Sequence, residues 1–258
     1  MGHERIGVLP QTKAWRDVID GISSAINLEI GTQELAWATL ENVRNQFRRI
    51  HEDPGVAAAF KFLLELSRSS LPNPSVRGAD TPEIELASNP SILRIVISLR
   101  AWVDEHRVST EYADLAKKAA ADVITAWSNQ QSQQPSLFSG AIDSQEIWRR
   151  AANGSGFCEV SRLFFARFTE RYLNYFLDRA ASAVLPSASE RDQFAAKVHE
   201  HLDDISKYAF ETSRITQSFA AGWFNLYALE RAPSNQELTS FLSIAFGKIR
   251  DELSREAR

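Results

Sequence analysis

Residues 164–181, FFARFTERYLNYFLDRAA, decide the fold because they mix aromatic rings and arginines in a helical spacing. At 100° per residue, Phe164, Phe168 and Tyr172 fall within one arc of about 80°, and leucines cover a second arc. A helix that is apolar over most of its circumference is usually buried inside a bundle. Stacking of nucleic-acid bases would instead need rings and cations on one exposed face. We therefore predict that residues 157–181 form the central, buried helix of the second half of the chain.

The remaining polar wedge of this helix contains Arg167 and Arg171, which are one turn apart. Glu170, three residues from Arg167, and Asp178 on the same wedge are the expected acidic partners, which predicts an intrahelical ion-pair strip. The alternative is an anion-binding or partner-binding site, helped by the exposed helix-start amides after NGSG at 153–156. This alternative leads to the hypothesis of a ligand- or nucleic-acid-sensing helical domain that uses an arginine-rich wedge.

Apolar residues recur at helical spacing along almost the whole chain, and no alternating strand pattern appears in the sequence. Asp143 with Glu146, Ser187 with Glu190 and Ser234 with Glu237 have the spacing of capping pairs, which mark helix starts. We predict an all-α fold, a multi-helix bundle of about nine or ten helices. The expected helical segments lie near 15–26, 35–50, 56–64, 90–105, 110–127, 157–181, 194–226 and 238–253, with two further helices that start at Pro82 and after Asp143.

A polar, glutamine-rich stretch, SNQQSQQPSLFSGA at about 128–141, is the best candidate for a linker. Aromatic residues become more frequent after it. The sequence therefore predicts two packed helical halves, an N-terminal half at 1–130 and an aromatic-rich C-terminal half at 142–258.

The composition is that of an ordinary soluble protein, with 44% hydrophobic and 24% charged residues. A net charge of −4 argues against strong nucleic-acid binding, because nucleic-acid-binding domains are usually strongly basic. The single Cys158 excludes an internal disulfide framework and suggests a reducing compartment. The first residues lack a signal-peptide pattern, and the most apolar run, ILRIVISL, is too short to cross a bilayer. We expect a cytoplasmic protein without a membrane segment.

Sequence motifs for common chemistry are missing: phosphate loop, dinucleotide glycine fingerprint, nucleophile elbow and paired CxxC. We therefore expect no cofactor and no metal. The weak metal candidates are His199 and Asp203 in HEHLDD (199–204), which share a helix face at a spacing of four. A metal site would need further ligands from other helices, so a solvated charged face is the favoured interpretation.

Two segments, RNQFRRIH at 44–51 and RAWVDEH at 100–106, each place an arginine a few residues before a histidine. This pattern resembles the R-x(4–6)-H motif of HEPN domains, all-helical bundles that often act as metal-independent RNases in toxin and phage-defence systems. The resemblance implies a dimer in which Arg44 with His51, or Arg100 with His106, would act on the scissile phosphate. Histidine titrates near neutrality and arginine neutralises phosphate charge, so the chemistry would be sound.

The leading hypothesis is a non-enzymatic helical interaction or adaptor subunit of a bacterial cytoplasmic multi-protein assembly. The surplus of tryptophans supports it, because tryptophan is enriched at protein interfaces as well as in cores. Trp37 and Trp148 are candidates for exposed anchors; the alternative is that both pack between the two halves. We expect a protein partner or a homo-oligomer. The HEPN-like RNase and the sensing domain are the competing functions.

Overall fold

The structure is a computed structural model that describes residues 49–71, 89–106, 110–132, 143–184 and 217–256, together with a few isolated positions such as Phe47. Every regular element in these residues is a helix, which confirms the all-α bundle. The count of nine or ten helices stays a prediction, since four of the expected helices, including the one that starts at Pro82, lie wholly or largely outside the described residues. The described elements are η1 (Ile50–Glu52), α3 (Pro54–Arg68), α4 (Ile92–His106), α5 (Thr110–Ser132), α6 (Ser144–Arg149), α7 (Gly154–Val184), α9 (Gln217–Trp223), η5 (Phe224–Ala228) and α10 (Asn235–Glu256).

Helix α3 is buried on nearly its whole circumference. It begins at Pro54 because the Asp53 carboxylate accepts hydrogen bonds from the Gly55 and Val56 amides, at 2.9 and 3.0 Å. A Cβ added to Gly55 would lie 2.5 Å from the Cβ of Ala113, so a glycine is needed where α3 approaches α5. The sequence pattern predicted a helix here but did not predict its central position.

Helix α7 is the long buried helix that the aromatic stretch predicted. The Asn153 side chain accepts a hydrogen bond from the Gly156 amide at 3.0 Å and so caps the helix start. A Cβ at Gly156 would lie 2.1 Å from the Arg150 carbonyl oxygen, so the turn from α6 requires glycine there. The fully buried aromatic side chains of α7 are Phe157, Phe164, Phe165, Phe168, Tyr172 and Phe176.

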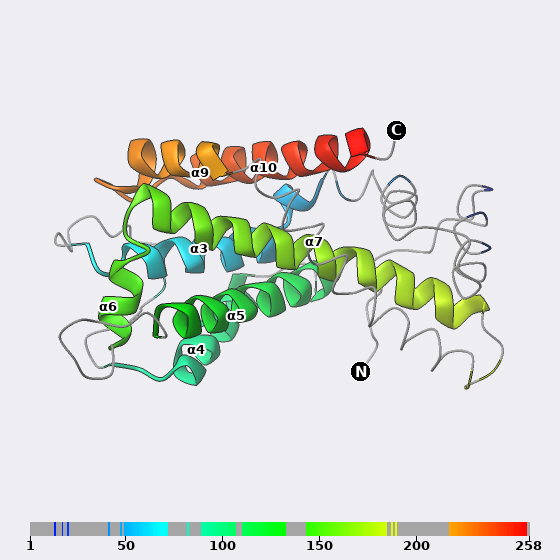
Figure 1. The fold of residues 1–258 in the computed structure, drawn as a ribbon, viewed down its shortest axis with the longest axis horizontal. Coiled ribbons are helices and arrows are strands. Elements are labelled where there is room, and N and C mark those ends of the chain that lie inside the picture. The colour runs from blue at the N-terminus through cyan, green and yellow to red at the C-terminus, as the bar shows by residue number, and fades with distance from the viewer. Residues whose placement is uncertain are drawn as a thin grey trace.

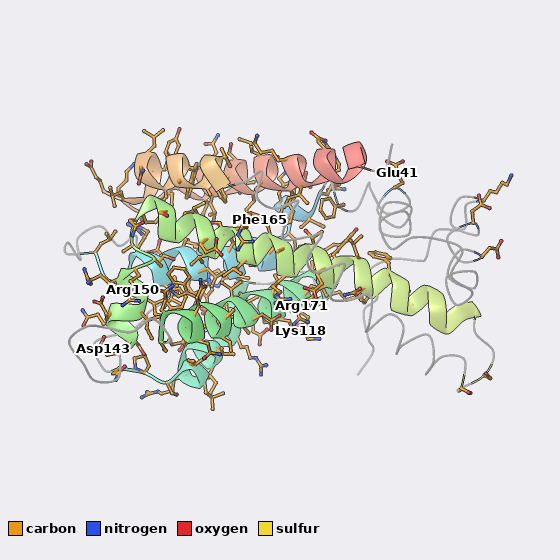
Figure 2. All side chains as sticks on the ribbon, viewed as in Figure 1. Glu41, Lys118, Asp143, Arg150, Phe165 and Arg171 are labelled. Carbon is orange, nitrogen blue, oxygen red and sulfur yellow. The ribbon has the colours of Figure 1, made fainter. Side chains whose placement is uncertain are left out.

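Phe60 of α3 joins the rings of two other helices into one core. Its ring centroid lies 5.3 Å from that of Phe164 and 5.2 Å from that of Phe241 on α10. Phe165 completes this group at 5.5 Å from Phe60, and Figure 2 shows it in the middle of the bundle. Ring pairs at such distances add to the hydrophobic gain from burial. Helices before and after the proposed linker therefore contribute to a single buried cluster. The division into two halves stays a prediction.

The described helices lie in successive rows across the bundle (Figure 1). Helices α9 and α10 lie along one edge, α7 and α3 cross the middle, and α5 and α4 lie toward the opposite edge. Helix α4 packs against α3 and α5. None of the described helices combines the length and the hydropathy that crossing a membrane would require.

A π-helical turn, η5, follows α9 and is held by a buried ion pair on α3. The Arg68 Nε atom donates to the Ala228 carbonyl at 2.7 Å, and its Nη1 atom donates to both Glu65 carboxylate oxygens at 2.7 Å. The two side chains are only 3% and 6% exposed. A buried pair of this kind is tolerated when its hydrogen-bonding groups are satisfied. The sequence did not indicate this pair.

Helix α10 begins with the reciprocal capping pair that the sequence predicted. The Glu237 amide donates to the Ser234 hydroxyl at 3.2 Å, and the Ser234 amide donates to the Glu237 carboxylate at 2.7 Å. Arg231 also binds this carboxylate. The Asp143 carboxylate caps α6 by accepting from the Glu146 amide at 2.7 Å, while the Glu146 carboxylate binds Arg149. These two helix starts are confirmed, and Glu190 of the third predicted pair lies outside the described residues.

Candidate functional site

The arginine-rich wedge of α7 is engaged by acidic side chains. Arg167 donates from Nη1 to Glu170 at 2.9 Å, which is the intrahelical pair that the sequence predicted. Arg171 donates from Nε to Asp122 on α5 at 3.1 Å, so its partner comes from another helix. Figure 2 shows Arg171 where α5 runs beside α7. Both guanidinium groups already bind carboxylates, so an incoming anion would have to compete for them.

Tyrosines beside this wedge connect the start of α5 to α7. The Tyr175 hydroxyl donates to Glu111 at 3.1 Å and accepts from Arg179 at 3.0 Å. Burial raises the pKa of Tyr112 to about 12 and raises that of Tyr172 further, with a mutual hydrogen bond between them. Both phenols therefore keep their protons at neutral pH and link α5 to α7 by their mutual hydrogen bond.

Trp148 is not the exposed anchor that the sequence predicted, because its side chain is fully buried. Its ring lies 6.4 Å from that of Trp127 on α5, and the Trp127 Nε1 atom donates to the Ile147 carbonyl at 3.2 Å. Helix α6 is therefore fastened to the end of α5 across the proposed linker. This is the alternative in which the tryptophan packs between the two halves. Trp37 lies outside the described residues.

Arg100 and His106 both belong to α4, which continues without a break through His106. Six residues on one α-helix separate two side chains by about 120°, so the pair projects in different directions. The Nδ1 atom of His106 lies 2.8 Å from the Trp102 carbonyl oxygen, and the two rings are 3.9 Å apart. His106 thus packs on its own helix, while Arg100 faces solvent.

The other predicted site residues are only partly described. His51 is half-buried in η1, directly before the cap of α3, whereas Arg44 lies outside the described residues. His199 and Asp203 lie outside them as well. Within the described part of the chain, no group of three or more His, Cys, Asp or Glu side chains is placed to hold a metal ion.

The solvent-facing side of α4 combines exposed apolar side chains with exposed arginines. Leu93 is 67% exposed and Ile97 is 55% exposed. These two residues are one turn apart and are therefore neighbours on the helix surface. Arg94 and Arg100 flank them, and Ala101 continues the apolar stripe. We call the surface formed by Leu93, Arg94, Ile97, Arg100 and Ala101 the α4 outer face.

Arg94 and Arg100 differ from the other arginines whose side chains the structure describes. Neither guanidinium group has a hydrogen bond or ion pair to any described residue. Each of the others binds an acidic, amide, carbonyl or hydroxyl group. Those paired arginines are Arg49, Arg68, Arg149, Arg150, Arg162, Arg167, Arg171, Arg179, Arg231 and Arg250. The two unpaired arginines of the described region thus lie beside its most exposed pair of neighbouring aliphatic side chains on a helix.

Other exposed aliphatic residues lie apart from unpaired arginines. Leu226 and Leu229 belong to η5 and the residue after it, and the nearby Arg231 is bound to Glu237. Ile244 is a single exposed residue on α10. Scattered exposed residues of this kind are normal on soluble proteins. The α4 outer face is therefore the strongest candidate for a functional surface among the described residues.

The sequence contained a signal for this surface that went unused. The run ILRIVISL has more apolar residues than one inward stripe of a helix needs. Ile95, Leu99 and Val103 fill the inward stripe. Leu93 and Ile97 are the surplus and point to the opposite side.

No protein-family model matches the chain, and neither a curated protein nor a solved structure shows significant similarity to it.

Proposed function

We propose that this chain is a helical interaction subunit of a bacterial cytoplasmic multi-protein assembly, and that it docks through the α4 outer face. The observation that carries the proposal is the juxtaposition of exposed Leu93 and Ile97 with the unpaired Arg94 and Arg100. Interfaces combine an apolar centre with arginine at or near its edge.

Binding a partner would remove the main apolar surface that this helix exposes to water. Burying a leucine or isoleucine side chain fully gains about 1.5–3 kcal/mol. Arginine contributes to interfaces through its aliphatic stem as well as through charge-assisted hydrogen bonds. The fold itself needs neither Leu93 nor Ile97, because the inward stripe of α4 is complete without them.

The competing functions have less support in the described geometry. The RNase hypothesis needs a converged arginine and histidine, and α4 projects Arg100 and His106 apart. The sensing hypothesis needs an available cation at the α7 wedge, where Arg167 and Arg171 both bind carboxylates.

The native mass of the tagged chain in extracts of its own host cells tests the proposal. We expect the wild-type chain to migrate in an assembly well above the 29.0 kDa of one chain. Ile97→Glu should release it, because a carboxylate would have to be buried in the interface. Ile244→Glu, at an exposed position on α10, is the matched control and should leave the assembly intact.

Two results would contradict the proposal in different ways. An assembly that survives Ile97→Glu would move the docking surface away from α4. A wild-type chain that migrates as a single chain in the host extract would remove the subunit function itself.

A further inference from the structure

The charges on the exposed side of α4 change sign along the helix. Arg94 and Arg100 lie in its first and middle turns, whereas Asp104 and Glu105 lie in its last turn. All four are exposed. We propose that the occupant of the α4 outer face is a second copy of this chain, docked with the two α4 helices antiparallel. This inference rests on the proposed function and names the partner of that same surface.

The positions of Arg94 and Glu105 carry the argument. Eleven residues on an α-helix correspond to a rotation of only about 20° from the same direction and to a rise of about 16 Å. The two side chains therefore lie on one flank of the helix, near its opposite ends. Neither has an ion-pair partner among the described residues.

A two-fold axis between positions 99 and 100 would pair these charges. In an antiparallel helix pair related by such an axis, each flank meets the same flank of the other copy. Arg94 would then lie opposite Glu105 of the second copy, and the reciprocal pair would form at the other end. In a two-fold interface every contact occurs twice, so the Arg94–Glu105 pair would form once at each end.

The apolar residues at the centre of the exposed side fit the same arrangement. Ile97 would lie beside Ala101 of the second copy, which places a large side chain against a small one. Antiparallel helix dipoles also attract weakly.

A second copy fits this surface better than an anionic membrane or a strongly acidic partner. Both of these would meet Asp104 and Glu105 at the end of the helix, and like charges repel. A second copy presents Arg94 to Glu105 and Glu105 to Arg94, so opposite charges face one another at both ends of the contact. The contact is a single helix face, which is small compared with the ~1,600 Å² of a standard interface. We therefore expect a weak dimer that forms at about 10–100 µM.

Sedimentation velocity of the purified full chain, from low to several-hundred-micromolar concentration, tests the proposal. The wild type should pass from monomer to dimer. Arg94→Glu and Glu105→Arg should each weaken the dimer at least about tenfold, because each places like charges opposite one another at both ends. The double variant, with both substitutions in one chain, should dimerise like the wild type. Arg149→Glu is the control at an exposed arginine on α6 and should have no effect.

Mixing the two single variants gives the sharpest readout. At concentrations where the wild type is mostly dimeric, each variant alone should be mostly monomeric, but an equimolar mixture should form a mixed dimer, because opposite charges then face one another at both ends. A wild type that stays monomeric at every concentration would overturn the proposal. A dimer that neither substitution weakens would overturn it as well, since another surface would then hold the copies together.

The outcome is separable from that of the proposed function. If the chain is monomeric when pure, yet its large assembly in host extract depends on Ile97, self-association is wrong and the subunit function stands. If the pure chain dimerises through α4 but no larger assembly exists in host extract, the dimer stands and the subunit function fails.

Discussion

Helices α7 and α4 are both rich in apolar residues, yet they use them in different ways. The aromatic side chains of α7 are buried against α3, α5, α9 and α10. Helix α4 buries one stripe against α3 and α5 and leaves Leu93 and Ile97 in solvent. The arginines of the two helices differ in the same way. Arg167 and Arg171 on α7 bind carboxylates, whereas Arg94 and Arg100 on α4 bind no described residue. In these two helices, apolar content does not distinguish the buried helix from the surface helix, whereas the pairing of their arginines does.

Removing a core ring should have the largest effect. Phe168 is fully buried on α7, with its ring 5.4 Å from that of Phe246 and 6.0 Å from that of Phe164. Phe168→Ala should lower the free energy of unfolding by about 3–5 kcal/mol, because it removes a large side chain and leaves a cavity. Urea unfolding measures this. Leu93→Ala on α4 is the matched control and should stay within about 0.5 kcal/mol of wild type; equal losses at both positions would erase the distinction between the helices.

Arginine substitutions test the same contrast in charge. Arg68→Met should cost about 3–5 kcal/mol, because it leaves the Glu65 carboxylate buried without its guanidinium partner. The Ala228 carbonyl would lose its donor as well. Arg94→Met on α4 should be close to neutral, since no described interaction is lost. Thermal and urea unfolding of both variants measure the difference, and a neutral Arg68→Met would show that the pair does not hold η5.

The capping pair of α10 should give a smaller, pH-dependent effect. The Arg231 side chain, followed by the Ser234 groups, lowers the pKa of Glu237 from its ordinary 4.5 to about 2. A carboxyl whose pKa is lower in the folded state stabilises the fold above its unfolded pKa and loses that contribution as pH falls toward the folded value. The stability difference between wild type and Glu237→Gln should therefore be full above about pH 5 and shrink between pH 4.5 and 2. Unfolding measured over this range checks it, and a constant difference would contradict the shifted pKa.

The sequence predicted the features that depend on residues close together in the chain. Ring density and helical spacing predicted the burial of α7, and capping spacings predicted the starts of α6 and α10. The contacts between distant segments were beyond it. Arg171 pairs with Asp122, and Arg68 with the Ala228 carbonyl, only because different helices meet. Trp148 was misjudged because its neighbours in sequence are arginines while its neighbours in space are core residues such as Trp127.

The candidate surface was missed for a related reason. In a helix with more apolar residues than one stripe, the sequence does not show which arc faces the bundle. That choice is made by α3 and α5, which accept Ile95, Leu99 and Val103 and leave Leu93 and Ile97 outside.

The contrast between Ile95 and Ile97 tests most directly whether folding of the monomer can do without the α4 outer face. These isoleucines are two residues apart on one helix, with exposures of 3% and 55%. Urea unfolding at about 1 µM, below the expected dimer range, isolates the monomer. Ile95→Glu should lose at least about 3 kcal/mol or fail to fold, because it buries an unpaired carboxylate. Ile97→Glu should unfold within about 0.5 kcal/mol of wild type. A comparable loss in both variants would show that the fold itself uses this face and would contradict its role as a docking surface.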